Sequence, residues 1–198
     1  MVHLCLDFEG VLIPEIWQCL AKEVNSDDLM LTTQDLKDYD ELMSLRMKVV
    51  NEKNIKLSDI QKIVRDIEPF DGAQEFLDWA RSKFQVTIVS DTFYELAWPL
   101  VEKLGYPSII CHNMTVENDK ITGYELRQSN NKQKVIEALQ SLKFKVFASG
   151  DSYNDINMLN TADLGIFFQA PEHIKEEYPH LLTASSHNEL KKILEEHI

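Results

Sequence analysis

From residue 71 onward the chain alternates between helical patterns and short apolar runs, and this alternation restricts the fold more than any other feature. The runs at residues 86–89 and 145–149 are short and apolar, as buried strands are. Residues 73–80 carry apolar side chains at the spacing of one helical face. This strand–helix alternation predicts an α/β fold with an open, parallel, doubly wound, Rossmann-like sheet.

The N-terminal part of the chain departs from this alternation. An apolar run at residues 2–8 ends at Gly10, as a buried first strand would. Three helical patterns then follow before Pro69 and Gly72 mark a break, and they cover residues 15–24, 38–54 and 57–67. We therefore expect a small helical cap inserted after the first strand, with the cap formed by residues 13–68 and the α/β core by residues 1–12 and 69–198.

Composition narrows the class of partner and the cellular setting. The net charge of −13 disfavours nucleic acid and anionic membranes as partners. No apolar stretch approaches the roughly 20 residues of a membrane span. Cys5, Cys19 and Cys111 are an odd and sparse set without CxxC spacing, which predicts a reducing, cytoplasmic setting.

Three polar segments follow predicted strands, and they are the candidate site. Ligands of open α/β sheets bind beyond the carboxyl ends of the strands. That rule selects residues 7–10, residues 90–92 and residues 150–155.

Carboxylates dominate two of these segments. Asp7 and Glu9 lie two residues apart at a strand end, and Asp151 and Asp155 follow a later strand. Buried acids repel one another unless they bind a cation or share a proton. Hard oxygen ligands of this kind suit Mg²⁺. Simpler interpretations remain open at this point, namely turn hydrogen bonds for the first pair and helix capping for the second.

The remaining polar groups complete a set that suffices for phosphoryl transfer. Ser90 offers a hydroxyl, and Lys132 offers a positive charge at a helix start, with Arg127 and Lys134 as competing cations. A carboxylate such as that of Asp7 can accept a phosphoryl group as an acyl phosphate. Positive charge and hydroxyls then neutralise the phosphoryl oxygens, while a second acid moves protons.

The sequence resembles the haloacid dehalogenase superfamily. The motifs that carry the resemblance are Asp7-Phe8-Glu9-Gly10-Val11, Ser90-Asp91, Lys132, and Gly150-Asp151 with Asp155, in the family's order. Within it, the chain looks most like phosphoserine phosphatases with a helical cap, and most of all like the bifunctional phosphoserine phosphatase/homoserine phosphotransferase variety. The closer match lies in Asp-Phe-Glu-Gly-Val-Leu-Ile-Pro-Glu-Ile-Trp, Ser-Asp-Thr-Phe-Tyr-Glu and Gly-Asp-Ser-Tyr-Asn-Asp.

The resemblance implies a role for each motif residue. Asp7 is the nucleophile and a Mg²⁺ ligand, and Glu9 is the acid/base and offers the metal its backbone carbonyl. Asp151 is the other direct ligand and Asp155 supports it. The phosphate is held by Ser90 and Lys132.

It also implies how the amino-acid part of the substrate binds. Glu15 matches the acid for the substrate ammonium, Arg46 the arginine for its carboxylate, and Asn154 a substrate-side asparagine. Two positions depart from the usual pattern: Glu9 stands where most of these phosphatases have Asp, and Asp91 stands in the substrate pocket where phosphoserine phosphatases usually have Gly. The alternatives are a phosphatase of another small phosphorylated metabolite and a catalytically silent regulatory homologue.

Overall fold

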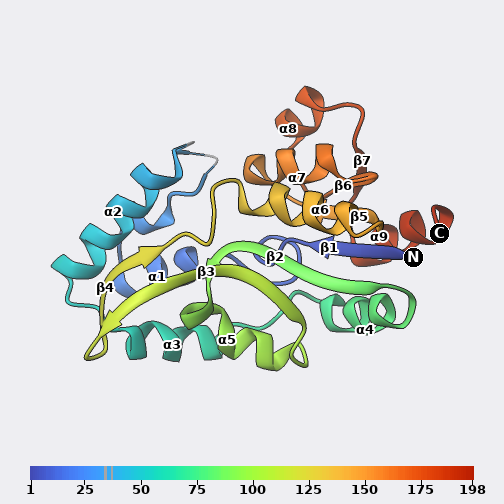
Figure 1. Ribbon diagram of the computed structural model, residues 1–198. Coiled ribbons are helices and arrows are strands. Elements are labelled where there is room, and N and C mark those ends of the chain that lie inside the picture. The colour runs from blue at the N-terminus through green and yellow to red at the C-terminus, as the bar shows by residue number, and fades with distance from the viewer. Residues whose placement is uncertain (34, 37) are drawn as a thin grey trace.

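A computed structural model describes residues 1–33, 35–36 and 38–198. Its centre is a seven-stranded sheet in the order β4-β3-β2-β1-β5-β6-β7 (Figure 1). The strands are β1 (Val2–Leu6), β2 (Gln85–Phe93), β3 (Ser108–Glu117), β4 (Lys120–Glu125), β5 (Lys145–Gly150), β6 (Leu164–Phe168) and β7 (Leu182–Ala184).

Six of the strands run parallel, as the strand–helix alternation predicts. The exception is β4, which pairs antiparallel with β3 through a hairpin at one edge of the sheet. Asn118 and Asp119 form its turn with φ values of 50° and 69°, in the left-handed region that Asn and Asp tolerate best. The expected doubly wound sheet is thus confirmed, with an antiparallel strand added at the edge.

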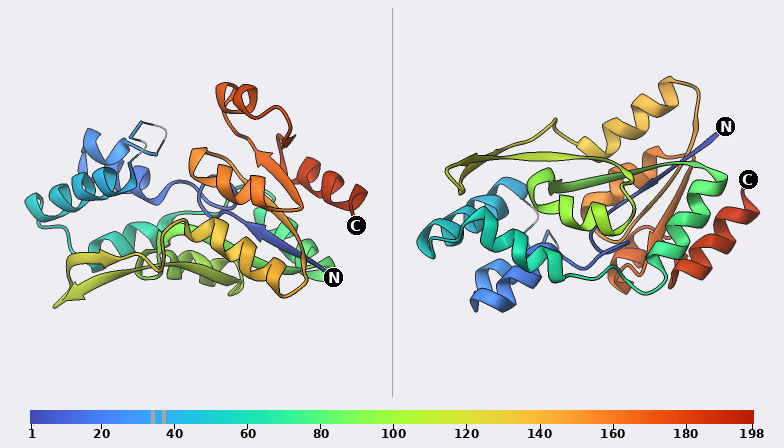
Figure 2. Two further views of the ribbon diagram at one scale, coloured as in Figure 1. Left: turned by 45° about the horizontal axis from the view of Figure 1, so that its top comes forward. Right: turned by 90° about the horizontal axis from the view of Figure 1, so that it is seen from below.

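Helices cover both faces of the sheet. On one face α6 (Asn131–Ser141) and α7 (Ile156–Thr161) pack against the central strands. On the other face lie α4 (Ala73–Lys83), α5 (Tyr94–Lys103) and α9 (His187–Glu196) (Figure 1). The three views place the two chain ends side by side, away from α1 and α2 (Figures 1 and 2).

A helical segment separates β1 from α4 along the chain. It contains α1 (Ile16–Val24), the 3-10 helix η1 (Asp27–Met30), α2 (Tyr39–Glu52) and α3 (Leu57–Asp66). Figures 1 and 2 show α1 and α2 beyond the carboxyl end of β1. The β3–β4 hairpin touches this segment, since the Asp119 carboxylate accepts hydrogen bonds from the backbone N–H of Ser58 at 2.9 Å and from its hydroxyl at 2.6 Å.

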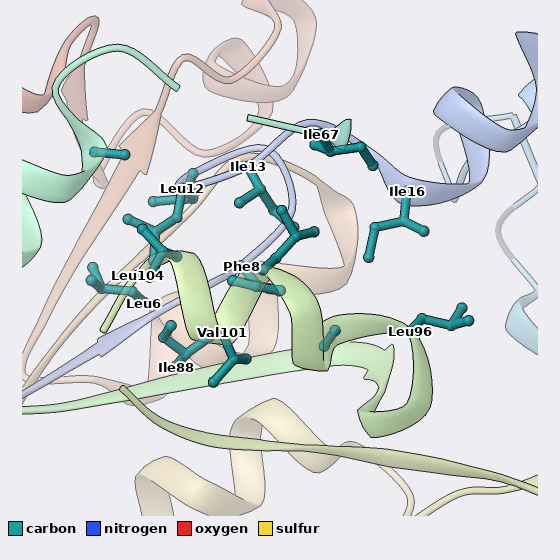
Figure 3. Close-up of a cluster of buried hydrophobic side chains, with 14 of the residues drawn as sticks. Leu6, Phe8, Leu12, Ile13, Ile16, Ile67, Ile88, Leu96, Val101 and Leu104 are labelled. Carbon is teal, nitrogen blue, oxygen red and sulfur yellow. The ribbon is translucent and has the colours of Figure 1, made fainter. Parts of the chain in front are cut away.

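A continuous apolar cluster joins the helical segment to the sheet. Leu6 at the end of β1 and Ile88 on β2 belong to the same cluster as Ile16 at the start of α1 (Figure 3). Leu96, Val101 and Leu104 of the α5 region belong to the same cluster, on the face of the sheet that α5 covers (Figure 3). Burial of these side chains stabilises the loop that leaves β1, at about 1.5–3 kcal/mol for each fully buried large side chain.

The short C-terminal elements were not foreseen from the sequence. They are β7 and α8 (Glu172–Glu177), whose few residues carry too little periodic pattern. In the part of the chain that the structure describes, no helix is long and apolar enough to cross a membrane. The three cysteines are free, with Cys5 and Cys111 buried and Cys19 half-buried.

Candidate active site

The three polar segments selected from the sequence follow three neighbouring strands. The sheet order β2-β1-β5 places the end of β1 between the ends of the other two. Asp7 therefore lies between Ser90 on β2 and Asp151 after β5, and its backbone N–H donates to Ser149 O at 2.9 Å. The parallel register brings together residues that lie more than 80 positions apart in the chain.

An acidic cluster is formed at this edge of the sheet. Asp7, Asp151 and Asp155 each offer a carboxylate oxygen within 4.8 Å of the others. Burial, the charge of Asp155 and that of Asp151 raise the pKa of Asp7 well above its usual value. Burial and the same neighbour, Asp155, raise the pKa of Asp151 as well. Three such acids are compatible with ionisation only when positive charge is close by.

Two glycines make room for the cluster. A Cβ at Gly10 would lie 2.3 Å from Cγ of Asp151, and Gly10 also has a φ of 79°. A Cβ at Gly150 would lie 2.3 Å from Cγ of Asp155. Any larger residue would displace the carboxylates, so these glycines are needed for the close approach of the acids.

Lys132 supplies the positive charge. Its ammonium lies 2.8 Å from Oδ2 of Asp7 and 2.7 Å from Oδ1 of Asp155, and its side chain is 3% exposed. Burial disfavours the charged form of Lys132. The nearby carboxylates, above all that of Asp155, outweigh this effect and raise the pKa of Lys132. Lys132 therefore stays protonated and partly neutralises the cluster.

The two competing cations lie elsewhere. Arg127 donates to the backbone carbonyl of Cys111 at 3.0 Å and packs on the ring of Tyr94. Lys134 is exposed, and its ammonium faces Ser129 Oγ at 3.4 Å. Of these three side chains, the structure brings Lys132 to the acids.

Glu9 occupies a different wall of the site. Its Oε1 accepts a hydrogen bond from the backbone N–H of Ile16 at 2.8 Å, at the start of α1. Burial and, second, the charge of Glu15 raise the pKa of Glu9 to about 7. An acid with such a pKa can both give and take a proton near neutral pH.

Ser90 brings a hydroxyl to the same cavity. It is 1% exposed, and its Oγ accepts a hydrogen bond from the Thr92 backbone N–H at 3.2 Å. This contact leaves the hydroxyl hydrogen to donate. Asp7, Glu9 and Ser90 all line one cavity, together with Lys132.

The helical segment contributes Glu15 and Arg46 to that cavity. Arg46 is 6% exposed, donates to Leu31 O at 3.1 Å and lies over the Trp17 ring with its Cζ 5.0 Å from the centroid. Its Nε is buried and has no hydrogen-bond partner among the described residues. Burial raises the pKa of Glu15, and the charge of Arg46 opposes that rise.

Asp91 and Asn154 line the cavity on the sheet side and contact each other. The Asn154 side-chain amide donates to Oδ2 of Asp91 at 3.1 Å. The Lys132 ammonium lies 3.8 Å from the same oxygen. Burial disfavours ionisation of Asp91. The charge of Lys132 and the hydrogen bond from His112 are the main effects that outweigh burial, so the pKa of Asp91 is lowered.

Sequence reasoning missed several residues at this site. The cavity is also lined by Trp17, Thr32, Thr33, Tyr39, Thr92 and Ser152. Tyr39 donates from its hydroxyl to the Asp91 carbonyl at 2.8 Å. Thr92 and Ser152 lie within the segments 90–92 and 150–155 that the strand-end rule selects. The residues of the helical segment that line the cavity carry no comparable signal in the sequence, so these are the ones that were missed.

The arrangement can perform nucleophilic chemistry on a phosphoryl group. The buried carboxylate of Asp7 contacts the ammonium of Lys132. Glu9, an acid with a pKa of about 7, and the hydroxyl of Ser90 line the same cavity. These are the groups that phosphoryl transfer to a carboxylate requires. A comparison with known proteins gives independent support, because a family model described as haloacid dehalogenase-like hydrolase matches residues 11–160.

The chain belongs to the haloacid dehalogenase-like hydrolases.

Sequence relatives narrow the position within this family. "Phosphoserine phosphatase ThrH" of Pseudomonas aeruginosa is 45% identical over 189 residues, which cover 95% of this chain and 92% of the relative. A phosphoserine phosphatase of Pseudomonas syringae pv. tomato is 46% identical over 189 residues, which cover 95% of this chain and 80% of the relative. The resemblance to the phosphoserine phosphatase group is thereby confirmed.

Solved structures of phosphoserine phosphatases share the fold of this chain. A phosphoserine phosphatase in its apo form matches with a TM-score of 0.78 at 22% identity, covering 98% of this chain and 97% of the other. A phospho-aspartyl intermediate analogue of phosphoserine phosphatase matches with a TM-score of 0.77 at 22% identity, over 98% and 97% of the two chains. At these identities the matches establish the common α/β architecture.

Proposed function

We propose that this protein is a Mg²⁺-dependent phosphoserine phosphatase that forms an aspartyl phosphate on Asp7. The observation that carries the proposal is the position of the Asp7 carboxylate. It lies at the centre of the sheet edge, 2.8 Å from the Lys132 ammonium and within the acidic cluster. The names of the two Pseudomonas relatives, both phosphoserine phosphatases, support the same activity.

The reaction proceeds in two displacements at phosphorus. In the first, an Asp7 oxygen attacks the phosphorus, the bond from phosphorus to the serine oxygen breaks, and Glu9 gives its proton to the departing serine. In the second, water attacks the phosphorus, Glu9 takes a proton from that water, and the bond to Asp7 breaks. Inorganic phosphate leaves, and both side chains return to their starting protonation states.

Ser90 and Lys132 hold the phosphoryl oxygens during both steps. The hydroxyl of Ser90 donates a hydrogen bond to one phosphoryl oxygen. The positively charged ammonium of Lys132 attracts another. Both side chains are buried, so their interactions with the developing charge are less weakened by solvent than at an exposed site.

The residues of the acidic cluster fit Mg²⁺. The donor set consists of hard carboxylate oxygens, and Gly10 and Gly150 leave the space that the acids need. Asp7 and Asp151 would be direct ligands, with the backbone carbonyl of Glu9, and Asp155 would support them. When bound, Mg²⁺ supplies positive charge that favours ionised Asp7 and neutralises phosphoryl oxygens.

The amino-acid part of the substrate faces the helical segment. Arg46 is a buried guanidinium whose Nε lacks a partner among the described residues, and a substrate carboxylate would supply one. Glu15 would receive the substrate ammonium, and Asn154 and Asp91 would complete the pocket on the sheet side. The segment of residues 13–68 then acts as a cap over a core of residues 1–12 and 69–198.

Phosphoryl transfer to homoserine is the second activity that we propose. Homoserine carries the same ammonium and carboxylate as serine, so Glu15 and Arg46 can hold either one. The aspartyl phosphate reacts with whichever hydroxyl is positioned beside it, and Glu9 can take the proton of an alcohol as it does that of water. We propose a reducing, cytoplasmic setting for these reactions, which the free cysteines support.

The direct test measures phosphate release from L-phosphoserine by the purified protein, with Mg²⁺ and with excess chelator. We expect Mg²⁺-dependent release that is lost on chelation. A set of other small phosphomonoesters serves as the comparison. Faster turnover of another metabolite would transfer the proposal to that substrate, and no turnover of any phosphomonoester with Mg²⁺ would favour a silent homologue.

A further inference from the structure

His112 lies beside the active site, although no sequence motif marks it. It is on β3, is 3% exposed, and pairs in register with Phe93 on β2. Its ring packs against Phe93 with a centroid distance of 6.1 Å and against Tyr39 of the helical segment at 6.3 Å. The histidine thus lies where the sheet meets the helical segment.

The hydrogen bonds of His112 determine which ring nitrogen carries the hydrogen. The backbone N–H of Arg127 lies 3.1 Å from Nδ1, and a backbone N–H can only donate. Nδ1 is therefore the acceptor, and the neutral ring carries its hydrogen on Nε2. Nε2 faces Oδ1 of Asp91 at 3.5 Å, so the remaining donor of the ring is directed at that carboxylate.

Asp91 connects the histidine to two residues of the proposed mechanism. Its other oxygen, Oδ2, accepts from the Asn154 amide at 3.1 Å and faces the Lys132 ammonium at 3.8 Å. The opposite end of the Asn154 amide is also held, because its Oδ1 accepts a hydrogen bond from the Ser152 hydroxyl at 2.5 Å. The orientation of Asn154 therefore depends on Asp91 at one end and on Ser152 at the other.

We propose that His112 is a positioning residue that acts through Asp91. Its Nε2–H fixes the rotation of the Asp91 carboxylate, and this carboxylate orients the Asn154 amide and lies 3.8 Å from the Lys132 ammonium. This inference rests on the proposed function, since Asn154 and Lys132 are there assigned to the substrate and its phosphate. It adds a residue to the specificity pocket that the family motifs do not contain.

The structure also offers a purely structural role from which the proposal must be separated. Through Nδ1, His112 holds the backbone of Arg127, in the chain that leads from β4 to α6. Two substitutions separate the contact with Arg127 from the contact with Asp91. The side-chain oxygen of His112→Asn can replace Nδ1 toward Arg127, but its amide does not reach Asp91. The longer His112→Gln can replace Nε2 and donate to Asp91.

The experiment measures kcat and KM for L-phosphoserine in both variants, with circular dichroism and thermal unfolding as checks of the fold. We expect His112→Asn to lose roughly tenfold in kcat/KM, the effect of one hydrogen bond to a charged group. His112→Gln is expected to keep most of the activity. The reverse order, or full activity in both variants, would overturn the proposal. His180→Gln is the matched control, because His180 is exposed and bonds to Asn160.

A double-mutant cycle with Asp91→Ala tests whether the effect passes through Asp91. Residues that act through a shared partner show non-additive effects. We expect His112→Asn to cause no further loss when Asp91 is already alanine. An unchanged tenfold loss in that background would mean that His112 acts on the fold or on Arg127, and the proposal would be wrong.

A measurement on the unsubstituted protein makes the inference independent of how the variants fold. Nitrogen-15 NMR of the histidine rings is expected to show His112 as the Nε2–H form. Its signal is assigned as the one that is absent from the spectrum of His112→Gln. An Nδ1–H form would overturn the proposal. If the protein hydrolyses another phosphomonoester instead of phosphoserine, the proposed function fails, while the same cycle on that substrate still decides the role of His112.

Discussion

The Nζ atom of Lys132 lies 2.8 Å from Oδ2 of Asp7, which joins the start of α6 to the end of the central strand β1. The same ammonium lies 2.7 Å from Oδ1 of Asp155. One lysine thus holds two carboxylates of the acidic cluster in place while leaving Asp7 facing the cavity. This contact favours the ionised form of Asp7, against the burial and the neighbouring acids that raise its pKa.

Asp7→Asn is expected to lower kcat for phosphoserine by more than about 10³-fold, because an amide is a poor nucleophile. The fold should survive, since Lys132 keeps its contact with Asp155 and one of the mutually repelling charges is removed. Without metal, the melting temperature should equal or exceed that of the unsubstituted protein. The control is Asp66→Asn at an exposed position of α3. Near-normal hydrolysis by a pure preparation would contradict the assignment of Asp7.

Glu9→Gln should lower turnover of phosphoserine by about 10²–10⁴-fold, the usual contribution of general acid–base catalysis. With p-nitrophenyl phosphate the leaving group needs no proton, so the first step should persist while attack by water stays slow. Rapid-mixing absorbance should then show a burst of nitrophenolate equal to the enzyme concentration. Equal losses on both substrates with no burst would mean that Glu9 does not act on the leaving group.

Removal of Mg²⁺ by a chelator should abolish activity, and Ca²⁺ should inhibit the Mg²⁺ form. Ca²⁺ takes more oxygen ligands at longer distances, and can draw both Asp7 oxygens into coordination. Independently of activity, Mg²⁺ should raise the melting temperature, because a ligand that binds the folded state stabilises it. Asp151→Asn should weaken that rise. Full activity in excess chelator would refute the metal requirement.

Arg46→Ala is expected to reduce kcat/KM for phosphoserine by roughly 10–150-fold, from loss of a contact worth about 1.5–3 kcal/mol. An aryl phosphate lacks the carboxylate, so its hydrolysis should change much less. Arg65→Ala on the exposed side of α3 is the matched control. Parallel losses on the two substrates would show that Arg46 does not recognise the substrate carboxylate.

Incubation with phosphoserine, Mg²⁺ and excess homoserine should yield phosphohomoserine at the expense of inorganic phosphate. A bound alcohol competes with bulk water when it is held in near-attack geometry beside the aspartyl phosphate. Phosphorus NMR follows both products in one sample. If inorganic phosphate alone forms at homoserine concentrations that saturate any inhibition, the enzyme is a phosphatase without this transferase activity.

The motif residues could be predicted because their signals are local. Asp7, Ser90 and Asp151 each follow an apolar run, and parallel strands present such ends at one edge of the sheet. The sequence also indicated the helical segment, since its patterns interrupt the strand–helix alternation. Residues 119–123 have the composition of a hairpin turn, but the antiparallel strand β4 itself is not evident in the sequence, because a short edge strand has few residues in which to show alternation.

Only the tertiary structure decided which side chains meet. The sequence favours Lys132 over Lys134 only by resemblance to the family motif. The buried face of α6 takes Lys132 to Asp7 and leaves Lys134 in solvent. His112 carries no motif and reaches Asp91 because β3 pairs with β2. The sequence by itself determined the chemistry available at each strand end, since that depends on residue type and local pattern. Contacts across the sheet and with the helical segment depend on strand order and packing, which involve residues far apart in the chain.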